Sequence, residues 1–258
     1  MKNFTKTLIA ATLALGTVSA NASILNDNSG AAEAWLSVYD STSANTFTLD
    51  LGVAGITWDS LIAQKDSTGL IQNVNLAGFS DWTAFKASAD LTTTKFSVAV
   101  GGELAGSKKA FMVTGSNSDF FQGGSSAGVS AVNIAINGHA TGINQDTATP
   151  FSPLVNSTTL VNDADATIGI HGNSAGLWDA ASFNVDADYG ELADFNLVTL
   201  ITANRRTSAV QEVFAGQWKL DGDNLTLGVS AIPVPAAVWM FGSALLGLAG
   251  VSRKRTTV

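Results

Sequence analysis

The chain has 258 residues, 46% of them hydrophobic and only 13% charged, with 21 acidic residues against 13 basic ones and no cysteine. The charged fraction is about half the ~25% of an average soluble domain, and lysine and arginine are too scarce for a nucleic-acid-binding surface. Without cysteine, disulfide scaffolds, thiolate zinc sites and cysteine nucleophiles are all excluded.

The first 22 residues have the pattern of a secretory signal peptide. Two lysines precede an apolar run from Leu8 to Val18, and Ala20 and Ala22 form an A-x-A cleavage site. We therefore expect signal peptidase to cut the chain after Ala22. Two of the 13 basic residues lie in this segment and three lie in the last six residues, so eight remain between, together with all 21 acidic residues.

Residues 23–231 are predicted to form one exported β-rich domain. Apolar and polar residues alternate with a period of two, as at Phe47, Leu49 and Leu51, which indicates half-buried strands. Alternation or composition predicts further strands at 34–39, 96–100, 110–114, 132–136, 168–170, 195–202, 210–214, 218–220 and 225–229. Turn residues such as Gly101 and Gly102 separate them. The expected fold is mainly β, a single β-sandwich or jelly-roll-like domain.

Helix is expected only at 57–65 and 81–89, the second capped by Ser80. The Gly- and Ser-rich stretch 123–153 is interpreted as a loop inside the domain, with a boundary between two halves of the domain as the alternative.

Three tryptophans lie beside an aspartate in irregular segments. We therefore expect their side chains to be partly exposed. They are Trp58, Trp82 and Trp178, and an exposed indole next to a carboxylate is suited to stacking on a sugar ring. Trp35 and Trp218 fall inside strand patterns and are expected in the core. The first three are therefore candidate carbohydrate-binding residues.

Carboxylates cluster late in the domain. The candidate metal ligands are Asp186, Asp188, Glu191, Asp221 and Asp223. Calcium binds six to eight oxygen ligands, and a weak calcium site is one interpretation of these clusters. The other is solvated turns, with a β-hairpin turn at Asp221 to Asn224. No other cofactor is expected.

The last segment, 232–258, repeats the pattern of the first in reverse. Its parts in chain order are Pro233, Val234 and Pro235, an apolar run over 236–251, and Arg253, Lys254 and Arg255. Sixteen helical residues reach about 24 Å, slightly less than the ~30 Å of a hydrocarbon core, so this is a marginal transmembrane helix. Basic residues outside both apolar runs predict that both extremities stay in the cytoplasm and that the domain between them is exported.

Residues Ile232 to Arg255 resemble the PEP-CTERM sorting signal, in its variant with Pro-Val-Pro in place of Pro-Glu-Pro. Residues 236–243 read Ala-Ala-Val-Trp-Met-Phe-Gly-Ser after the proline motif, as in a common form of that signal. The resemblance implies cleavage near the proline motif by a membrane-embedded exosortase, in bacteria that make exopolysaccharide. Ser243 and Gly247 also give the helix a small-residue face that another membrane helix can approach. A permanent C-terminal anchor is the alternative.

The preferred hypothesis is a noncatalytic surface or extracellular-matrix protein, not an enzyme, associated with exopolysaccharide or biofilm. It would cross the inner membrane transiently through its tail and end at the cell surface or outside, with signal peptidase, exosortase and exopolysaccharide as partners. A lectin-like carbohydrate-binding module is the first alternative. An exported carbohydrate-active enzyme is the second, and its candidate carboxylates are Glu33, Glu103, Glu191 and Glu212.

Overall fold

The computed structural model describes residues 24–25, 31–67, 69–104, 108–115, 126–145, 158–162, 186–203 and 206–228. The strands are β1 (Trp35–Asp40), β2 (Asn45–Asp50), β3 (Leu70–Asn75), β4 (Thr94–Leu104), β5 (Lys108–Gly115), β6 (Thr158–Asn162), β7 (Ala187–Asp188), β8 (Leu192–Ala203), β9 (Arg206–Asp221) and β10 (Asn224–Gly228). The helices are α1 (Trp58–Gln64), α2 (Ser80–Ser88) and α3 (Ser126–Gln145), with a 3-10 helix η1 (Leu51–Ala54).

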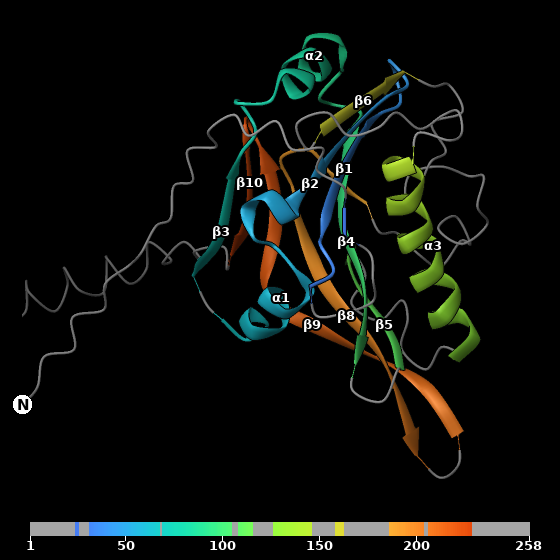
Figure 1. Ribbon diagram of the computed structural model, residues 1–258. Coiled ribbons are helices and arrows are strands. Elements are labelled where there is room, and N and C mark those ends of the chain that lie inside the picture. Colours follow the sequence, from blue (N-terminus) through green and yellow to red (C-terminus); the bar gives the residue numbers. More distant parts are fainter. Residues whose placement is uncertain are drawn as a thin grey trace, which may run out of the picture.

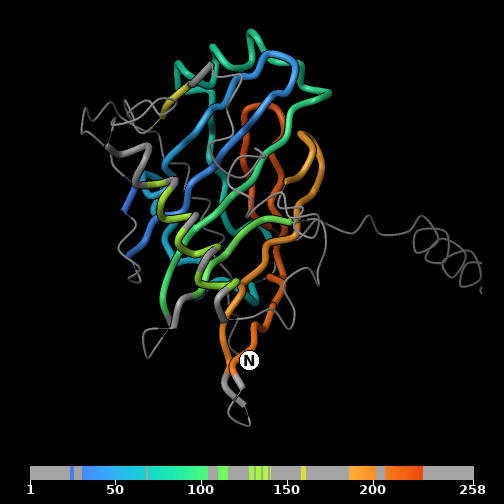
Figure 2. Tube along the Cα trace, turned by 90° about the vertical axis from the view of Figure 1, so that its right-hand side faces the viewer, coloured from blue at the N-terminus to red at the C-terminus, as the bar shows by residue number. Residues whose placement is uncertain are grey.

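All ten strands belong to one antiparallel sheet, which confirms the mainly β prediction (Figure 1). The strand order is β3-β10-β9-β8-β5-β4-β1-β2-β6, and the two-residue β7 pairs with β4 off this path. The finer expectation of two stacked sheets is not confirmed, because the described strands share a single hydrogen-bonded sheet. Figure 2, which is turned by 90° from the view of Figure 1, shows that this sheet curls.

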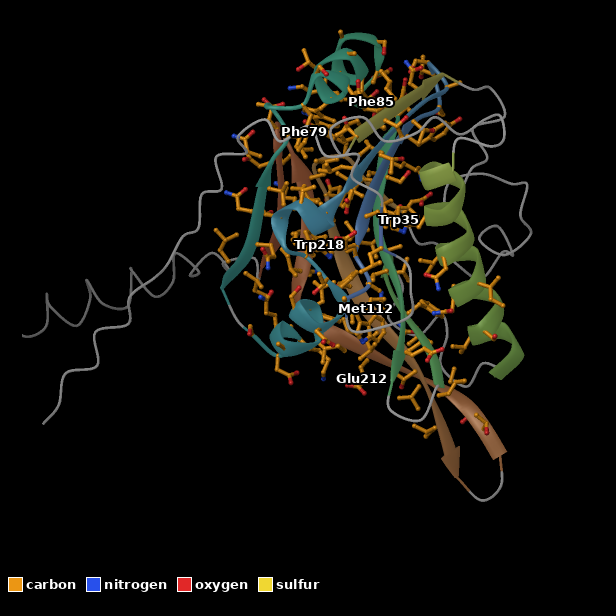
Figure 3. All side chains as sticks on the ribbon, viewed as in Figure 1. Trp35, Phe79, Phe85, Met112, Glu212 and Trp218 are labelled. Atoms are coloured by element: carbon orange, nitrogen blue, oxygen red, sulfur yellow. The ribbon has the colours of Figure 1, made fainter. Side chains whose placement is uncertain are left out.

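The concave face of the sheet holds the main hydrophobic core. Apolar residues at every second position point into it, as the alternation predicts. They include Leu36, Val38, Phe47, Leu49, Phe96, Val98, Met112, Phe195, Trp218 and Leu225. Val74 of β3 and Phe47 of β2 stand near opposite ends of the strand order yet share this cluster, so the curl closes the core. Figure 3 places Met112 and Trp218 inside it.

The other face of the sheet carries a second, smaller core beneath α3. Trp35, Phe111 and Val198 point to this side, and α3 covers them with Val129, Val132, Ile136 and Ala140 (Figures 1 and 3). The prediction of a strand at 132–136 is therefore wrong, and so is the prediction of a loop over the part of 123–153 that α3 occupies. The buried positions of α3 are three and four residues apart, and Ile134 between them is 63% exposed.

Gly101 and Gly102 lie inside β4 and do not form the predicted turn. A Cβ atom at Gly101 would collide with the side-chain amide of Asn137 on α3, and one at Gly102 would collide with the Trp58 indole on the opposite face. Asn133 of α3 also donates hydrogen bonds to the carbonyl oxygens of Gly102, at 3.1 Å, and Ala110, at 2.6 Å. The two glycines therefore let a helix pack closely on each face of the sheet.

Both predicted short helices are confirmed. Thr57 caps α1 in a reciprocal pair with Ser60, in which each side chain accepts a hydrogen bond from the backbone N–H of the other residue. The cap predicted for α2 is wrong, because Phe79 occupies the N-cap position without a side-chain bond and Ser80 is already helical. The ranges 210–214 and 218–220 join in the single strand β9, and β3, β6 and β7 were not predicted.

Several predicted features lie outside the described residues. They are the signal peptide with Ala20 and Ala22, the strand at 168–170, Trp178, and the whole tail 232–258 with its proline motif and basic end. Among the helices that the structure does describe, none combines the length and the apolar character needed to cross a membrane.

Candidate functional site

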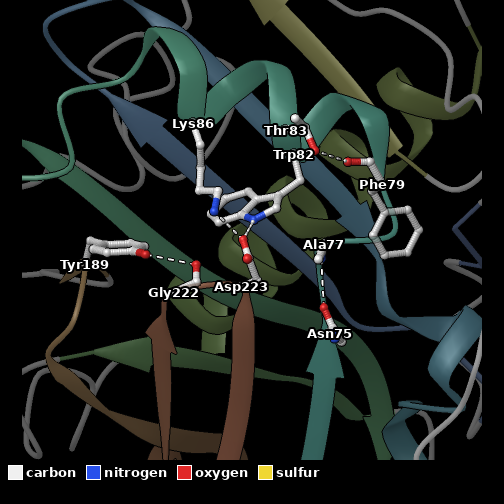
Figure 4. A network of polar contacts seen from close by, with 9 residues as sticks. All are labelled: Asn75, Ala77, Phe79, Trp82, Thr83, Lys86, Tyr189, Gly222 and Asp223. Atoms are coloured by element: carbon white, nitrogen blue, oxygen red, sulfur yellow. Dashed lines mark hydrogen bonds and ion pairs between the residues drawn. The ribbon is translucent and has the colours of Figure 1, made fainter.

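The structure brings the two described acidic clusters to the same end of the sheet. Gly190, in the turn after β7, donates its backbone N–H to the carbonyl oxygen of Leu220 at 2.8 Å. The Tyr189 hydroxyl donates to the carbonyl oxygen of Gly222 at 2.9 Å (Figure 4). These two bonds hold the turn between β7 and β8 against the turn between β9 and β10.

The turn between β9 and β10 is a two-residue hairpin turn, which confirms that interpretation of residues 221–224. Asp221 and Asn224 are paired across it, and Gly222 has a φ of 60°. Glycine adopts a positive φ without the steric cost that a Cβ atom brings, so it fits the first central position of such a turn.

Asp223 anchors helix α2 to this hairpin (Figure 4). The Trp82 Nε1–H donates to Oδ1 of Asp223 at 2.8 Å, and the Lys86 ammonium donates to the same oxygen. The hydrogen bond from Lys86, followed by that from Trp82, holds the pKa of Asp223 below its ordinary value. Lys86 also lies 5.8 Å from the centroid of the Trp82 ring, within range of a cation–π interaction. Asp223 is thus an ionised structural anchor.

Two of the other candidate metal ligands are paired with lysine side chains. Lys219 Nζ lies 2.8 Å from Oδ2 of Asp221, and Lys95 Nζ lies 3.7 Å from Oδ1 of Asp188. The hydrogen bond from Lys219 lowers the pKa of Asp221. Asp186 is half-buried and Glu191 is exposed. Within the described part of the chain, no three His, Cys, Asp or Glu residues are close enough to hold a metal ion together.

Calcium binding stays a prediction, and its test is thermal. A cation that binds only the native state raises the melting temperature by mass action, so millimolar calcium should raise that of the protein, and magnesium should raise it less. Asp223→Asn serves as a comparison, because it removes a carboxylate that already holds Lys86. Identical melting curves in calcium and in chelator would contradict calcium binding. The acidic residues would then be explained as turn residues and as partners of lysines.

The prediction that Trp58 and Trp82 are partly exposed is wrong. Their exposed fractions are 2% and 0%, so neither indole can stack on a sugar. Each lies in the first turn of a helix together with its neighbouring aspartate, whose negative charge is favoured there by the helix dipole. The core positions predicted for Trp35 and Trp218 are confirmed, at 1% and 0% exposure. The stacking hypothesis now rests on Trp178 alone.

Sequence reasoning missed one carboxylate of unusual electrostatics, Asp50. It is 2% exposed at the end of β2, and its Oδ1 accepts the backbone N–H of Gly52 at 2.8 Å, which caps η1. Burial, and then the nearby charge of Glu33, raise the pKa of Asp50 to about 7, against the smaller opposing effect of the Gly52 N–H. An aspartate at a strand end followed two residues later by glycine is the signal that could have found this cap.

Perturbed carboxylates are common in active sites, but this one has no access to a substrate. Asp50 is enclosed, and Oε2 of Glu33 accepts the backbone N–H of Leu25 at 2.6 Å. Comparison with protein-family models, curated proteins and solved structures gives no match. The remaining glutamates stand on separate elements, Glu103 on β4, Glu191 before β8 and Glu212 on β9. The polar contacts of Asp50, Glu33 and Asp223 that the structure describes hold parts of the fold together.

Proposed function

We propose that this chain is a noncatalytic surface or extracellular-matrix protein, exported by its N-terminal signal and sorted through its C-terminal tail by an exosortase. The ordered signals at the two ends of the sequence are the basis of this proposal. The β domain between them is the exported part, and exopolysaccharide or biofilm is the setting that the tail's resemblance implies.

The boundaries of the folded domain support this proposal. Ile24, two residues after the expected signal peptidase site, is 1% exposed in the core beneath α3. At the other end, β10 finishes at Gly228, five residues before Pro233. Cuts after Ala22 and near the proline motif would therefore remove no described strand. The described fold is thus compatible with both cuts, and the proposal itself depends on the ordered signals at the two ends of the sequence.

The alternatives have less support. Two of the three tryptophans proposed for a lectin-like module are buried, and the carboxylates proposed for a carbohydrate-active enzyme stand on separate elements or support the fold. A noncatalytic role requires only a stable domain that survives removal of both ends.

The proposal predicts the termini of the mature protein. Intact-mass and peptide mass spectrometry of the protein from its unmodified host should find a start at Ser23 and an end near residues 233–235. Removal of the exosortase should leave protein that is cut only after Ala22 and retained in the inner membrane. Removal of Arg253, Lys254 and Arg255 should let the tail slip outward, because these charges hold its end in the cytoplasm.

The matched control is a substitution of Val234 by Glu, which restores the commoner form of the motif and should preserve processing. Extracellular protein that still contains peptides over Trp239 to Leu248 would contradict processing and favour a permanent anchor.

A further inference from the structure

Residues 24 and 25, the first that the structure describes, are docked onto the folded domain. Ile24 is 1% exposed and belongs to the core beneath α3, together with Trp35 and Val132. The backbone N–H of Leu25 donates to Oε2 of Glu33 at 2.6 Å, and the backbone N–H of Glu33 donates to the carbonyl oxygen of Leu25 at 2.8 Å. Both backbone polar groups of Leu25 are therefore engaged, although its side chain is 40% exposed.

Glu33, the partner of Leu25, is itself fixed by its neighbours. Its backbone forms a β-bridge with Thr57, the N-cap residue of α1. A Cβ atom at Gly52 would lie 2.2 Å from Cδ of Glu33, so the carboxyl group lies directly against η1. The acceptor for the Leu25 N–H is thus part of the packed domain and cannot follow Leu25 away from it without disturbing η1 and the start of α1.

This docking lies next to the bond that signal peptidase is expected to cut. That bond joins residues 22 and 23, so Ile24 is the second residue after it and Leu25 is the third. Proteins that bind an extended peptide do so largely through the backbone N–H and C=O groups of the peptide, and we expect the same of a protease and the residues around the bond it cuts. Since consecutive Cα atoms are only about 3.8 Å apart, two residues of chain give too little slack to present the bond while Ile24 and Leu25 stay in place.

From these contacts we propose that the folded domain protects the bond after Ala22 from signal peptidase, so that cleavage must come before Ile24 is buried. The inference rests on the proposed function, since it takes residues 1–22 as a signal peptide. A chain that folds first keeps its signal peptide and stays attached to the membrane. The cluster that buries Ile24 includes Leu200 and Ala209, so the docking site is complete only after most of the chain has been exported, and the peptidase has that time to act.

The test compares the folded full chain with a peptide that cannot dock. Purified signal peptidase in detergent acts on the full-length precursor and on a synthetic peptide of residues 1–31, and mass spectrometry follows the appearance of the new N-terminus at Ser23. Circular dichroism checks that the precursor is folded. The peptide should be cut after Ala22. The folded precursor should be cut about 30-fold more slowly or less readily still, because its cleavage follows the small population in which residues 24 and 25 have opened locally.

Two neighbouring substitutions separate docking from the sequence preference of the enzyme. Ile24→Ser removes the buried apolar side chain and should raise the rate for the folded precursor about tenfold. Leu25→Ser is the matched control, because it changes a side chain that is 40% exposed and keeps both backbone hydrogen bonds, so its effect should be much smaller. The same substitutions in the peptide measure the preference of the enzyme, and each precursor rate is divided by the rate of its peptide.

Substitutions at Glu33 test the second contact without changing the residues around the cut bond. Glu33→Ala should raise the rate for the folded precursor about fivefold, because the Leu25 N–H loses its acceptor. Glu33→Gln should keep most of the protection, since its amide oxygen can still accept that N–H. Glu191→Ala removes an exposed carboxylate elsewhere and should leave the rate unchanged. Circular dichroism of each variant checks its fold.

The outcomes separate this protection from the proposed function. A peptide that is not cut after Ala22 would overturn the signal peptide, and the protection with it. A peptide that is cut, together with a folded precursor that is cut at the same rate, would overturn the protection alone. Equal acceleration by Ile24→Ser and Leu25→Ser would show that the burial of Ile24 is not its cause and would also overturn it.

Discussion

Gly102→Val should lower the free energy of unfolding by about 3 kcal/mol or more, a large part of the ~5–15 kcal/mol that holds a domain folded. The added side chain would overlap the indole of Trp58, which is 2% exposed and fixed in the core. Neither the strand nor the helix can move away cheaply, because β4 pairs with β1 and β5. Urea denaturation followed by tryptophan fluorescence measures the loss.

Two glycine substitutions serve as controls. At Gly138, exposed on α3, an added Cβ meets nothing, so Gly138→Ala should stabilise the protein by up to about 1 kcal/mol through helix propensity. Gly101→Ala should cost less than Gly102→Val, since it displaces only the end of the Asn137 side chain. Equal stability of the Gly102→Val protein and the unsubstituted protein would contradict the close packing of Trp58 on β4.

Asp50→Asn should stabilise the protein at pH 8 by about 2–4 kcal/mol, and the gain should vanish near pH 4. The pKa of Asp50 is about 7 in the fold and about 3.8 in the unfolded chain. Between these values the native state holds a proton that the unfolded state has released, so stability falls as the pH rises through this window. The asparagine cannot ionise, and its amide oxygen can still accept the Gly52 N–H. Melting temperatures from pH 4 to 8 check the result.

Asp40→Asn is the control, because it should change the stability of the protein in the opposite direction to Asp50→Asn. Burial raises the pKa of Asp40, but hydrogen bonds from the side chains of Ser43 and Thr93 and from the backbone N–H groups of Ser43 and Thr42 outweigh it and lower this pKa to about 2. Its ionised form therefore stabilises the fold above about pH 4, a contribution lost as the pH falls through 2. The Asn variant should be less stable by about 2 kcal/mol at pH 7. A gain in stability at pH 8 from both Asp50→Asn and Asp40→Asn would contradict the opposite pKa shifts of these two carboxyl groups.

Period-two patterns identify strands where one face of the sheet is buried against a core. Leu36 and Val38, or Phe96 and Val98, alternate with smaller or more polar residues, and the strands form as predicted. The strands that were missed, such as β3 and β6, are sheet edges with few buried apolar residues. Pairing with a neighbour far away in sequence makes them strands, and no local pattern reports it.

The error at α3 has a related cause. Over five residues, Val132, Ile134 and Ile136 fit a strand as well as a helix, and glycines lower the apparent helix propensity. The buried set extends from Val129 to Ala140 at helical spacing because the apolar residues of the sheet's second face need a cover. Likewise, Trp82 beside Asp81 suggests exposure until Asp223, 141 residues later, provides the partner for its indole.

The sheet order has a consequence for when the domain can fold. β3, an early strand, pairs with β10, the last strand that the structure describes, and Leu76 donates its backbone N–H to the carbonyl oxygen of Asp223. Lys65 and Glu212 likewise meet across 147 residues. A chain that emerges from its N-terminus cannot close this core until Gly228 has followed, and such long-range pairing is slow. The described sheet is thus completed only when the chain as far as Gly228 is available, so a chain that ends before β10 leaves β3 without its partner strand.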